Sequence, residues 1–138
     1  MTPERFLLDT SALMAFIEDE EGVEEIEQLL KREDSIVPWP ALLELYYITL
    51  REKGQSEANQ RYALLRQLKV EIRWDMDEPT LLTAGEIKAH HRISLADAMI
   101  AAFALRQGAV LVHKDPEFEA LAGLVPMKSL PYKSSPNR

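Results

Sequence analysis

The chain has 138 residues, of which 46% are hydrophobic, and this is enough for one domain with a buried core. It contains no cysteine, which excludes disulfides, zinc–thiolate sites and thiol nucleophiles. No apolar run approaches the roughly 20 residues that a membrane-spanning helix needs. We therefore expect a soluble, cytoplasmic protein that has no membrane partner.

The net charge of −7 is distributed unevenly along the chain. Seven of the 23 acids lie between residues 18 and 27, where there is no base, and the remainder is balanced at 16 acids against 16 bases. We interpret this acidic segment as the solvated face of a helix that turns apolar side chains inward. The expected inward residues are Val23, Ile26, Leu29 and Leu30. The overall charge therefore neither demands nor forbids a nucleic-acid partner.

Short apolar runs alternate with longer amphipathic segments along the chain. In chain order we expect a strand at 6–8, helices at 12–17 and over the acidic segment, a strand at 35–37, helices at 41–53 and 56–68, a strand at 70–74, helices at 78–89 and 93–105, a strand at 109–112, a short helix at 116–121 and a strand at 125–127. Thr10 or Ser11 is the expected cap of the first helix, and Gly54 is expected to end the helix at 41–53.

This alternation predicts the fold class. Strands that are apolar throughout and separated by helices indicate a mostly parallel sheet covered on both faces. We expect an α/β fold of three α/β/α layers, with about five short strands in the central sheet. Residues 1–130 would form the single domain, and residues 131–138 would form a frayed tail.

The predicted helix at 93–105 carries one acid, Asp97, among apolar and small residues. An ionised carboxylate is costly in such a helix unless it is hydrogen-bonded, paired or bound to metal. Ser94 and Asp97 also have the spacing of a helix N-cap followed by an acid in the first turn. These interpretations are compatible, because a carboxylate in the first turn can point out of the helix mouth.

Three further acids occupy positions of interest. Asp9 and Asp115 follow the predicted strands at 6–8 and 109–112, and ligands of parallel sheets bind beyond such strand ends. Each has a local alternative, since Asp9 could belong to a turn and Asp115 precedes Pro116 as an N-cap would. Glu44 lies within an apolar helical segment, although its long side chain could reach water.

Together, the four acids indicate a metal site. Their mutual repulsion would oppose clustering unless a cation neutralised them. An oxygen-only ligand set suits Mg²⁺ or Mn²⁺. Such an ion activates water for attack on a phosphodiester. The sequence contains no serine-hydrolase elbow, P-loop or dinucleotide-binding glycine motif.

Four segments resemble the PIN-domain ribonucleases, in particular the VapC-type toxins of VapBC toxin–antitoxin pairs. They are L-L-D-T-S-A-L at 7–13, the helical Glu44, L-A-D-A-M-I-A-A at 95–102 and V-H-K-D-P-E-F at 112–118. The resemblance implies a PIN-like domain over 1–130, and a metal-dependent endoribonuclease that binds Mg²⁺ or Mn²⁺ and hydrolyses RNA. It also implies a cognate antitoxin and a homodimer as partners.

The resemblance assigns the site as well. It implies that Asp9, Glu44, Asp97 and Asp115 are the catalytic and metal-binding residues, with Ser11 and Glu117 auxiliary to them. The family commonly has Ser or Thr two residues before the fourth acid, whereas this chain has His113. This chain therefore departs from the family pattern at the residue that would give Asp115 polar support.

Two alternatives remain at the level of the sequence. One is a non-catalytic PIN-like interaction module, which His113 keeps open. The other is a receiver-like domain that is phosphorylated at or near Asp9, although the acidic pair and the switch lysine of such domains are not evident. The expected partner surface comprises Leu13, Phe16, Ile17, Tyr46 and Tyr47, for which core packing is the competing explanation.

Overall fold

The computed structural model describes residues 4–133, and its sheet contains five strands that are all parallel. The strands are β1 (Phe6–Leu8), β2 (Ser35–Pro38), β3 (Glu71–Arg73), β4 (Val110–His113) and β5 (Met127–Ser129). Their order across the sheet is β3-β2-β1-β4-β5. The prediction of a central parallel sheet with about five short strands is confirmed.

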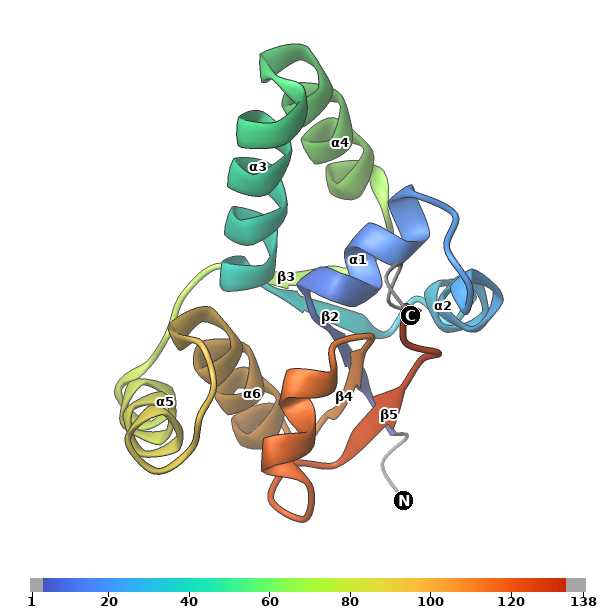
Figure 1. Ribbon diagram of the computed structural model, residues 1–138. Coiled ribbons are helices and arrows are strands. Elements are labelled where there is room, and N and C mark those ends of the chain that lie inside the picture. The colour runs from blue at the N-terminus through green and yellow to red at the C-terminus, as the bar shows by residue number, and fades with distance from the viewer. Residues whose placement is uncertain (1–3, 134–138) are drawn as a thin grey trace.

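Helices cover both faces of this sheet. They are α1 (Thr10–Ile17), α2 (Val23–Lys31), α3 (Trp39–Lys53), α4 (Gln55–Gln67), α5 (Glu78–His90), α6 (Leu95–Gln107) and the 3-10 helix η1 (Pro116–Leu121). Helices α1 and α2 lie on one side of the sheet, and α5 and α6 lie on the other (Figure 1). The predicted three-layer α/β/α architecture is therefore confirmed. In the described part of the chain, no helix is both long and apolar enough to cross a membrane.

The order of the strands determines where a site can form. The chain moves outward from β1 through β2 to β3, and then returns to place β4 on the other side of β1. Leu7 of β1 is paired with Ile36 of β2 and with Leu111 of β4. The chain thus leaves β1 and β4 in different directions at the same edge, which opens a crevice where parallel sheets bind ligands.

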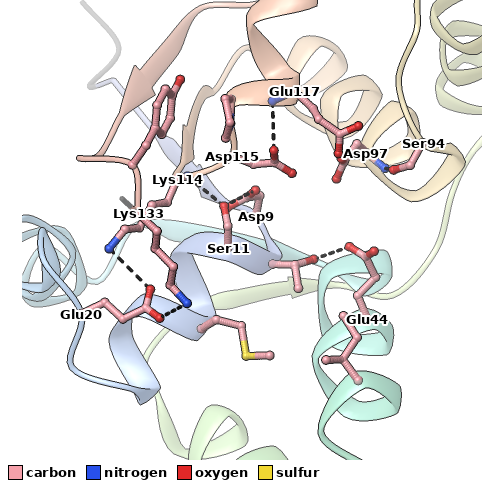
Figure 2. Close-up of a pocket in the computed structure, with 15 residues that line it drawn as sticks. Asp9, Ser11, Glu20, Glu44, Ser94, Asp97, Lys114, Asp115, Glu117 and Lys133 are labelled. Atoms are coloured by element: carbon pink, nitrogen blue, oxygen red, sulfur yellow. Dashed lines mark hydrogen bonds and ion pairs between the residues drawn. The ribbon is translucent and has the colours of Figure 1, made fainter. Parts of the chain in front are cut away.

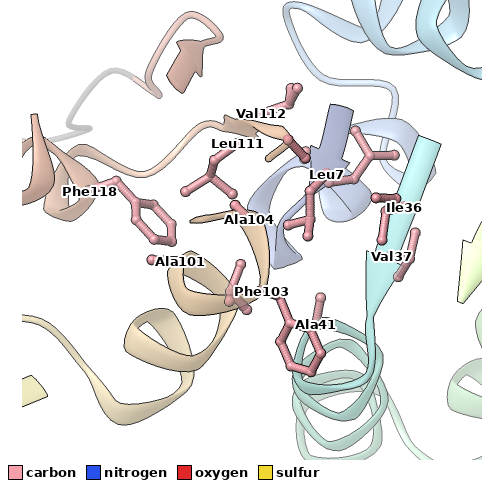
Figure 3. Packing of buried hydrophobic residues seen from close by; sticks show 14 of the residues in the cluster. Leu7, Ile36, Val37, Ala41, Ala101, Phe103, Ala104, Leu111, Val112 and Phe118 are labelled. Atoms are coloured by element: carbon pink, nitrogen blue, oxygen red, sulfur yellow. The ribbon is translucent and has the colours of Figure 1, made fainter. Parts of the chain in front are cut away.

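The central strands β1 and β2 are short and completely buried, whereas the edge strands β3 and β5 are partly exposed. Leu7 and Leu8 of β1 are each 0% exposed, and since neighbouring residues of a strand point to opposite faces, both faces are covered. Figure 3 shows Phe103 and Ala104 of α6 in the same buried cluster as Leu111 of β4 and Ala41 of α3. This cluster anchors the beginning of α3 and the body of α6 to the sheet.

Helices α3 and α4 form an adjacent pair that projects from the body of the molecule (Figure 1). Gly54 is the single residue between the two helices, and its φ of +95° is a value that favours glycine. The predicted role of Gly54 as the end of the first of these helices is confirmed.

Several predicted details were wrong, each for a local reason. Helix α1 begins at Thr10 and is capped by Asp9, because the Asp9 carboxylate accepts a hydrogen bond from the N–H of Ala12. Helix α2 begins only at Val23, so the acids of residues 18–21 precede the helix instead of lining its face. Strand β5 begins at Met127, two residues later than predicted, and it follows Pro126, which has no N–H to donate.

The expected partner surface is also only partly exposed. Leu13 belongs to the buried core, whereas Phe16, Ile17 and Tyr46 are partly buried. The exposed apolar residues in this region lie on α3 and include Tyr47 and Leu43. Residues 134–138 of the predicted tail lie outside the described residues, so a frayed tail there stays a prediction.

The buried cluster gives a test of the fold. Phe103→Ala should lower the free energy of unfolding by about 3–5 kcal/mol, because it leaves a cavity at a fully buried aromatic position. The control is Leu81→Ala on α5, where the side chain is 56% exposed and the expected change is within about 0.5 kcal/mol. Urea denaturation measures both, and similar losses in the two variants would contradict the described packing.

Candidate active site

A cleft of about 570 Å³ opens at the carboxyl edge of β1 and β4 (Figure 2). Its walls come from α1, α3, the first turn of α6 and the segment after β4. Six acidic residues line it: Asp9, Glu20, Glu44, Asp97, Asp115 and Glu117. All four acids that the sequence singled out therefore reach one cleft.

Asp9 lies at the bottom of this cleft and is 1% exposed. Its Oδ1 accepts a hydrogen bond from the N–H of Ala12 at 2.7 Å, and its two carboxylate oxygens face the Ser11 hydroxyl at 2.8 and 2.7 Å. Burial raises the pKa of Asp9 to about 7, and the negative charge of Asp97 adds to this effect, while the hydrogen bonds oppose it. Asp9 is thus both a helix cap and a buried, protonatable acid.

Asp97 occupies the first turn of α6. The Ser94 hydroxyl accepts a hydrogen bond from the Asp97 N–H at 3.1 Å, so the predicted capping pair is present. This cap uses the main chain of Asp97 and leaves its carboxylate at the cleft. Burial raises the pKa of Asp97 to about 7, assisted by the negative charges of Asp115 and Glu44.

The segment after β4 supplies two more carboxylates. Asp115 caps η1, where its Oδ1 accepts a hydrogen bond from the N–H of Glu117 at 2.9 Å. One carboxylate oxygen from each of Asp97, Asp115 and Glu117 lies within 4.8 Å of the others. Glu117, predicted only as auxiliary, is therefore part of the tightest acidic group among the described residues.

Glu44 lies across the cleft on α3 and is partly buried. The Thr10 hydroxyl donates a hydrogen bond to its Oε1 at 2.6 Å, so the side chain is held toward α1 rather than free in solvent. Glu44 and Asp9 line the same cleft as Asp97, Asp115 and Glu117 but lie outside their 4.8 Å group.

Ser11 connects the two strand ends. Its hydroxyl donates toward the Asp9 carboxylate and accepts a hydrogen bond from the Lys114 N–H at 2.8 Å. The residue thus contacts the site directly, whereas the capping role that the sequence suggested belongs to Asp9. Ser11 fixes the spacing between the end of β1 and the segment that follows β4.

The sequence did not predict Thr10, Glu20 or Lys133 as site residues. Lys133 Nζ lies 2.6 Å from Glu20, and the buried Lys114 Nζ lies 3.4 Å from the other oxygen of the same carboxylate. Glu20 is one of a run of acids with no local distinction, so only the fold could identify it. Thr10 follows Asp9 directly in the sequence, and this position was the one feature that could have marked it as a site residue.

The donor set of the cleft fits a hard divalent cation. Every ligating atom in the group of Asp97, Asp115 and Glu117 is a carboxylate oxygen, as Mg²⁺ and Mn²⁺ prefer. The raised pKa values of Asp9 and Asp97 mean that the negative charge is poorly compensated by the protein itself. A bound cation would supply that compensation.

Comparison with known proteins agrees with this geometry. The family model for the PIN domain matches residues 6–124, which is most of the chain. The chain belongs to the PIN-domain family. The resemblance noted in the sequence is therefore confirmed, and the matched residues include Asp9, Glu44, Asp97 and Asp115.

Solved structures share the fold of this PIN-domain chain. VapBC2 from Rickettsia felis, bound to a DNA fragment from its promoter, matches with a TM-score of 0.76 and 19% identity over 92% of this chain and 99% of that one. DNA-bound VapBC from Salmonella typhimurium matches with a TM-score of 0.72 and 22% identity over 92% of this chain and 98% of that one. VapC20 from Mycobacterium tuberculosis, a Sarcin-Ricin loop cleaving toxin, matches with a TM-score of 0.66 and 18% identity over 85% of this chain and 95% of that one. No curated protein sequence matches the chain significantly.

The raised pKa values predict how stability depends on pH without metal. The carboxyls of Asp9 and Asp97 have pKa values of about 7 in the folded chain, above the ordinary 3.8. Their contribution to stability is therefore complete below about pH 4 and is lost as the pH rises through about 7. Asp97→Asn removes one such group. The melting temperature of this variant minus that of wild type should therefore be larger at pH 8 than at pH 5.

Thermal melts in the presence of a chelator at both pH values measure this difference. Glu24→Gln, at an exposed position of α2 outside the cleft, is the control and should follow wild type. An Asp97→Asn protein that is less stable than wild type at pH 8 would contradict the electrostatic argument and leave a structural role for the carboxylate.

Proposed function

We propose that this PIN-domain chain is a metal-dependent endoribonuclease and the toxin of a toxin–antitoxin pair. The observation that carries the proposal is the convergence of the Asp97, Asp115 and Glu117 oxygens within 4.8 Å beside the buried Asp9. Buried acids of like charge are costly, and they are tolerated where a cation and its chemistry require them.

The proposed site divides its roles among the predicted residues. Asp9 and Asp97 hold Mg²⁺ or Mn²⁺, Asp115 completes the site, and Glu117 assists it. When bound, such an ion lowers the pKa of water and polarises a phosphoryl oxygen, which is the chemistry that phosphodiester hydrolysis needs. Ser11 fixes the Asp9 carboxylate through the contacts of 2.7 and 2.8 Å.

Glu44 has the geometry to orient the attacking water or to add a ligand. Its Oε1 is held by the Thr10 hydroxyl, and the carboxylate faces the cleft from the side opposite Glu117 (Figure 2). A carboxylate fixed in this way can accept a proton without first reorganising. This supports a role for Glu44 in water orientation, while the carboxylates across the cleft hold the ion.

The partners and location follow the same proposal. We propose RNA as the substrate, a cognate antitoxin as the inhibitor, a homodimer as the assembly and the cytoplasm as the location. The neighbours from Rickettsia felis and Salmonella typhimurium are VapBC complexes, and VapC20 cleaves the Sarcin-Ricin loop, which supports the substrate and the antitoxin partner proposed here. The exposed apolar side chains of α3, among them Leu43 and Tyr47, support a protein partner on that helix.

Metal-dependent RNA cleavage is the direct test. Purified protein should cleave RNA on addition of Mg²⁺ or Mn²⁺, and excess chelator should abolish cleavage. Asp97→Asn and Asp115→Asn should each lower the rate by at least about 100-fold, since even outer-shell partners of metal sites cost 10–100-fold. Glu24→Gln should retain the wild-type rate, because its side chain is exposed outside the cleft.

Two outcomes would reject this proposal in different ways. Cleavage that is unaffected by chelator would exclude the metal mechanism. If Asp97→Asn folds normally and arrests growth on expression as strongly as wild type, the chain acts instead as a non-catalytic interaction module. The Asp97→Asn variant preserves the Ser94 cap, because that cap uses the main chain of Asp97.

The antitoxin assignment predicts a competition for the same oxygens. An arginine side chain can pair with carboxylates in a bidentate manner, so an arginine-bearing peptide should bind the cleft and be weakened by Mg²⁺. Asp9→Asn should also weaken the peptide, because it removes one negative charge from the cleft. Calorimetry with and without Mg²⁺ measures this, and an affinity that neither change affects would contradict the assignment. Light scattering that shows only a monomer would exclude the dimer.

A further inference from the structure

The segment that joins β4 to η1 has an unusual set of hydrogen bonds. The N–H of Lys114 donates to the Ser11 hydroxyl at 2.8 Å, that of Asp115 donates to His113 Nδ1 at 3.2 Å, and that of Glu117 donates to Asp115 Oδ1 at 2.9 Å. Three main-chain groups within four residues are thus satisfied by side chains. The conformation of this segment therefore depends on which side chains are present.

His113 is held in one orientation by its surroundings. It is the last residue of β4 and is 1% exposed. Its carbonyl accepts a hydrogen bond from the Leu130 N–H at 2.8 Å, which continues the pairing with β5. Its ring centroid lies 5.1 Å from that of Phe118 and 6.1 Å from that of Tyr132. These contacts with two aromatic rings leave the imidazole little freedom to rotate.

The hydrogen bond requires a particular form of the imidazole. Nδ1 accepts from a main-chain N–H, so it carries no proton, and the proton of the neutral ring is on Nε2. In this form the ring accepts a hydrogen bond from the amide of Asp115.

We propose that His113 is a positioning residue of the acidic cluster, which acts by holding the main chain of Asp115. The inference rests on the proposed function, since the carboxylates so placed are those of the metal site. The Asp115 carboxylate in turn holds the Glu117 N–H, so one acceptor sets the position of two of the three oxygens in the 4.8 Å group.

The physical reason is the precision that such a site needs. Asp115 lies on the connection between β4 and η1, and Glu117 lies in the first turn of this short 3-10 helix, whereas Asp97 belongs to the longer α-helix α6. Ligands have to be held within about 0.5 Å of the productive geometry, and residues on irregular segments achieve this only with support from their neighbours. The amide contact to His113 supplies this support for Asp115.

The competing explanation is that His113 only fills space between Phe118 and Tyr132. Two substitutions separate the explanations because each preserves one property of the ring. His113→Phe keeps an aromatic ring in the core but has no acceptor. His113→Asn keeps an acceptor near the position of Nδ1 but loses the ring and its packing.

Mn²⁺ affinity of the folded protein and thermal stability without metal are measured for both variants. His113→Phe should weaken Mn²⁺ binding by about 10-fold or more, the range for outer-shell partners of metal sites. His113→Asn should melt at a lower temperature than wild type, since it leaves a cavity, and yet bind Mn²⁺ close to the wild-type affinity. Equal Mn²⁺ affinities in the two variants would overturn the proposal.

A second readout separates this proposal from the proposed function. Hydrogen exchange of the Asp115 amide, followed by NMR without metal, should be faster in His113→Phe than in His113→Asn. If wild type binds no Mn²⁺, the metal mechanism fails, and this exchange difference still decides the positioning role. Equal exchange in the two variants would overturn it. Should His113→Phe not fold, His113→Leu replaces it as the variant without an acceptor.

Discussion

The pairing of β1 with β4 is the constraint on which the candidate site depends. These strands are neighbours in space although about a hundred residues separate them, and the Asp9 N–H continues the pairing by donating to the Val112 carbonyl at 3.2 Å. Ser11 then links Asp9 to the amide of Lys114. Because both strands end at the same edge, the residues that follow them must share one cleft.

The same constraint creates an electrostatic cost. Asp9 and Asp97 are buried next to other acids, and the pKa of each is raised to about 7 by burial and by neighbouring negative charge. Protein stability alone would favour neutral residues at these positions. The cost is consistent with a site that is complete only when a cation is present, as in the proposed nuclease, and it has no purpose in a purely structural cluster.

Helix capping and site formation coincide throughout this cleft. Asp9 caps α1, Asp115 caps η1, and Ser94 caps α6 through the main chain of Asp97. In each case the capping geometry directs a carboxylate, or leaves one free, at a helix start near the sheet edge. The local explanation for each acid was therefore correct, and it did not compete with the functional one, since caps are a reliable way to fix such side chains.

The sequence by itself determined the elements, the parallel sheet and the four acids, because apolar runs, strand ends and an acid in an apolar helix are local patterns. The family resemblance added Ser11 and Glu117. Only the tertiary structure decided that Asp9 rather than Thr10 or Ser11 caps α1, that Glu117 groups with Asp97 and Asp115 within 4.8 Å, and that Glu20 reaches the cleft. It also showed that His113 accepts a hydrogen bond from the Asp115 amide. These features depend on contacts between residues far apart in the chain or on the choice among adjacent side chains, and no local pattern specifies either.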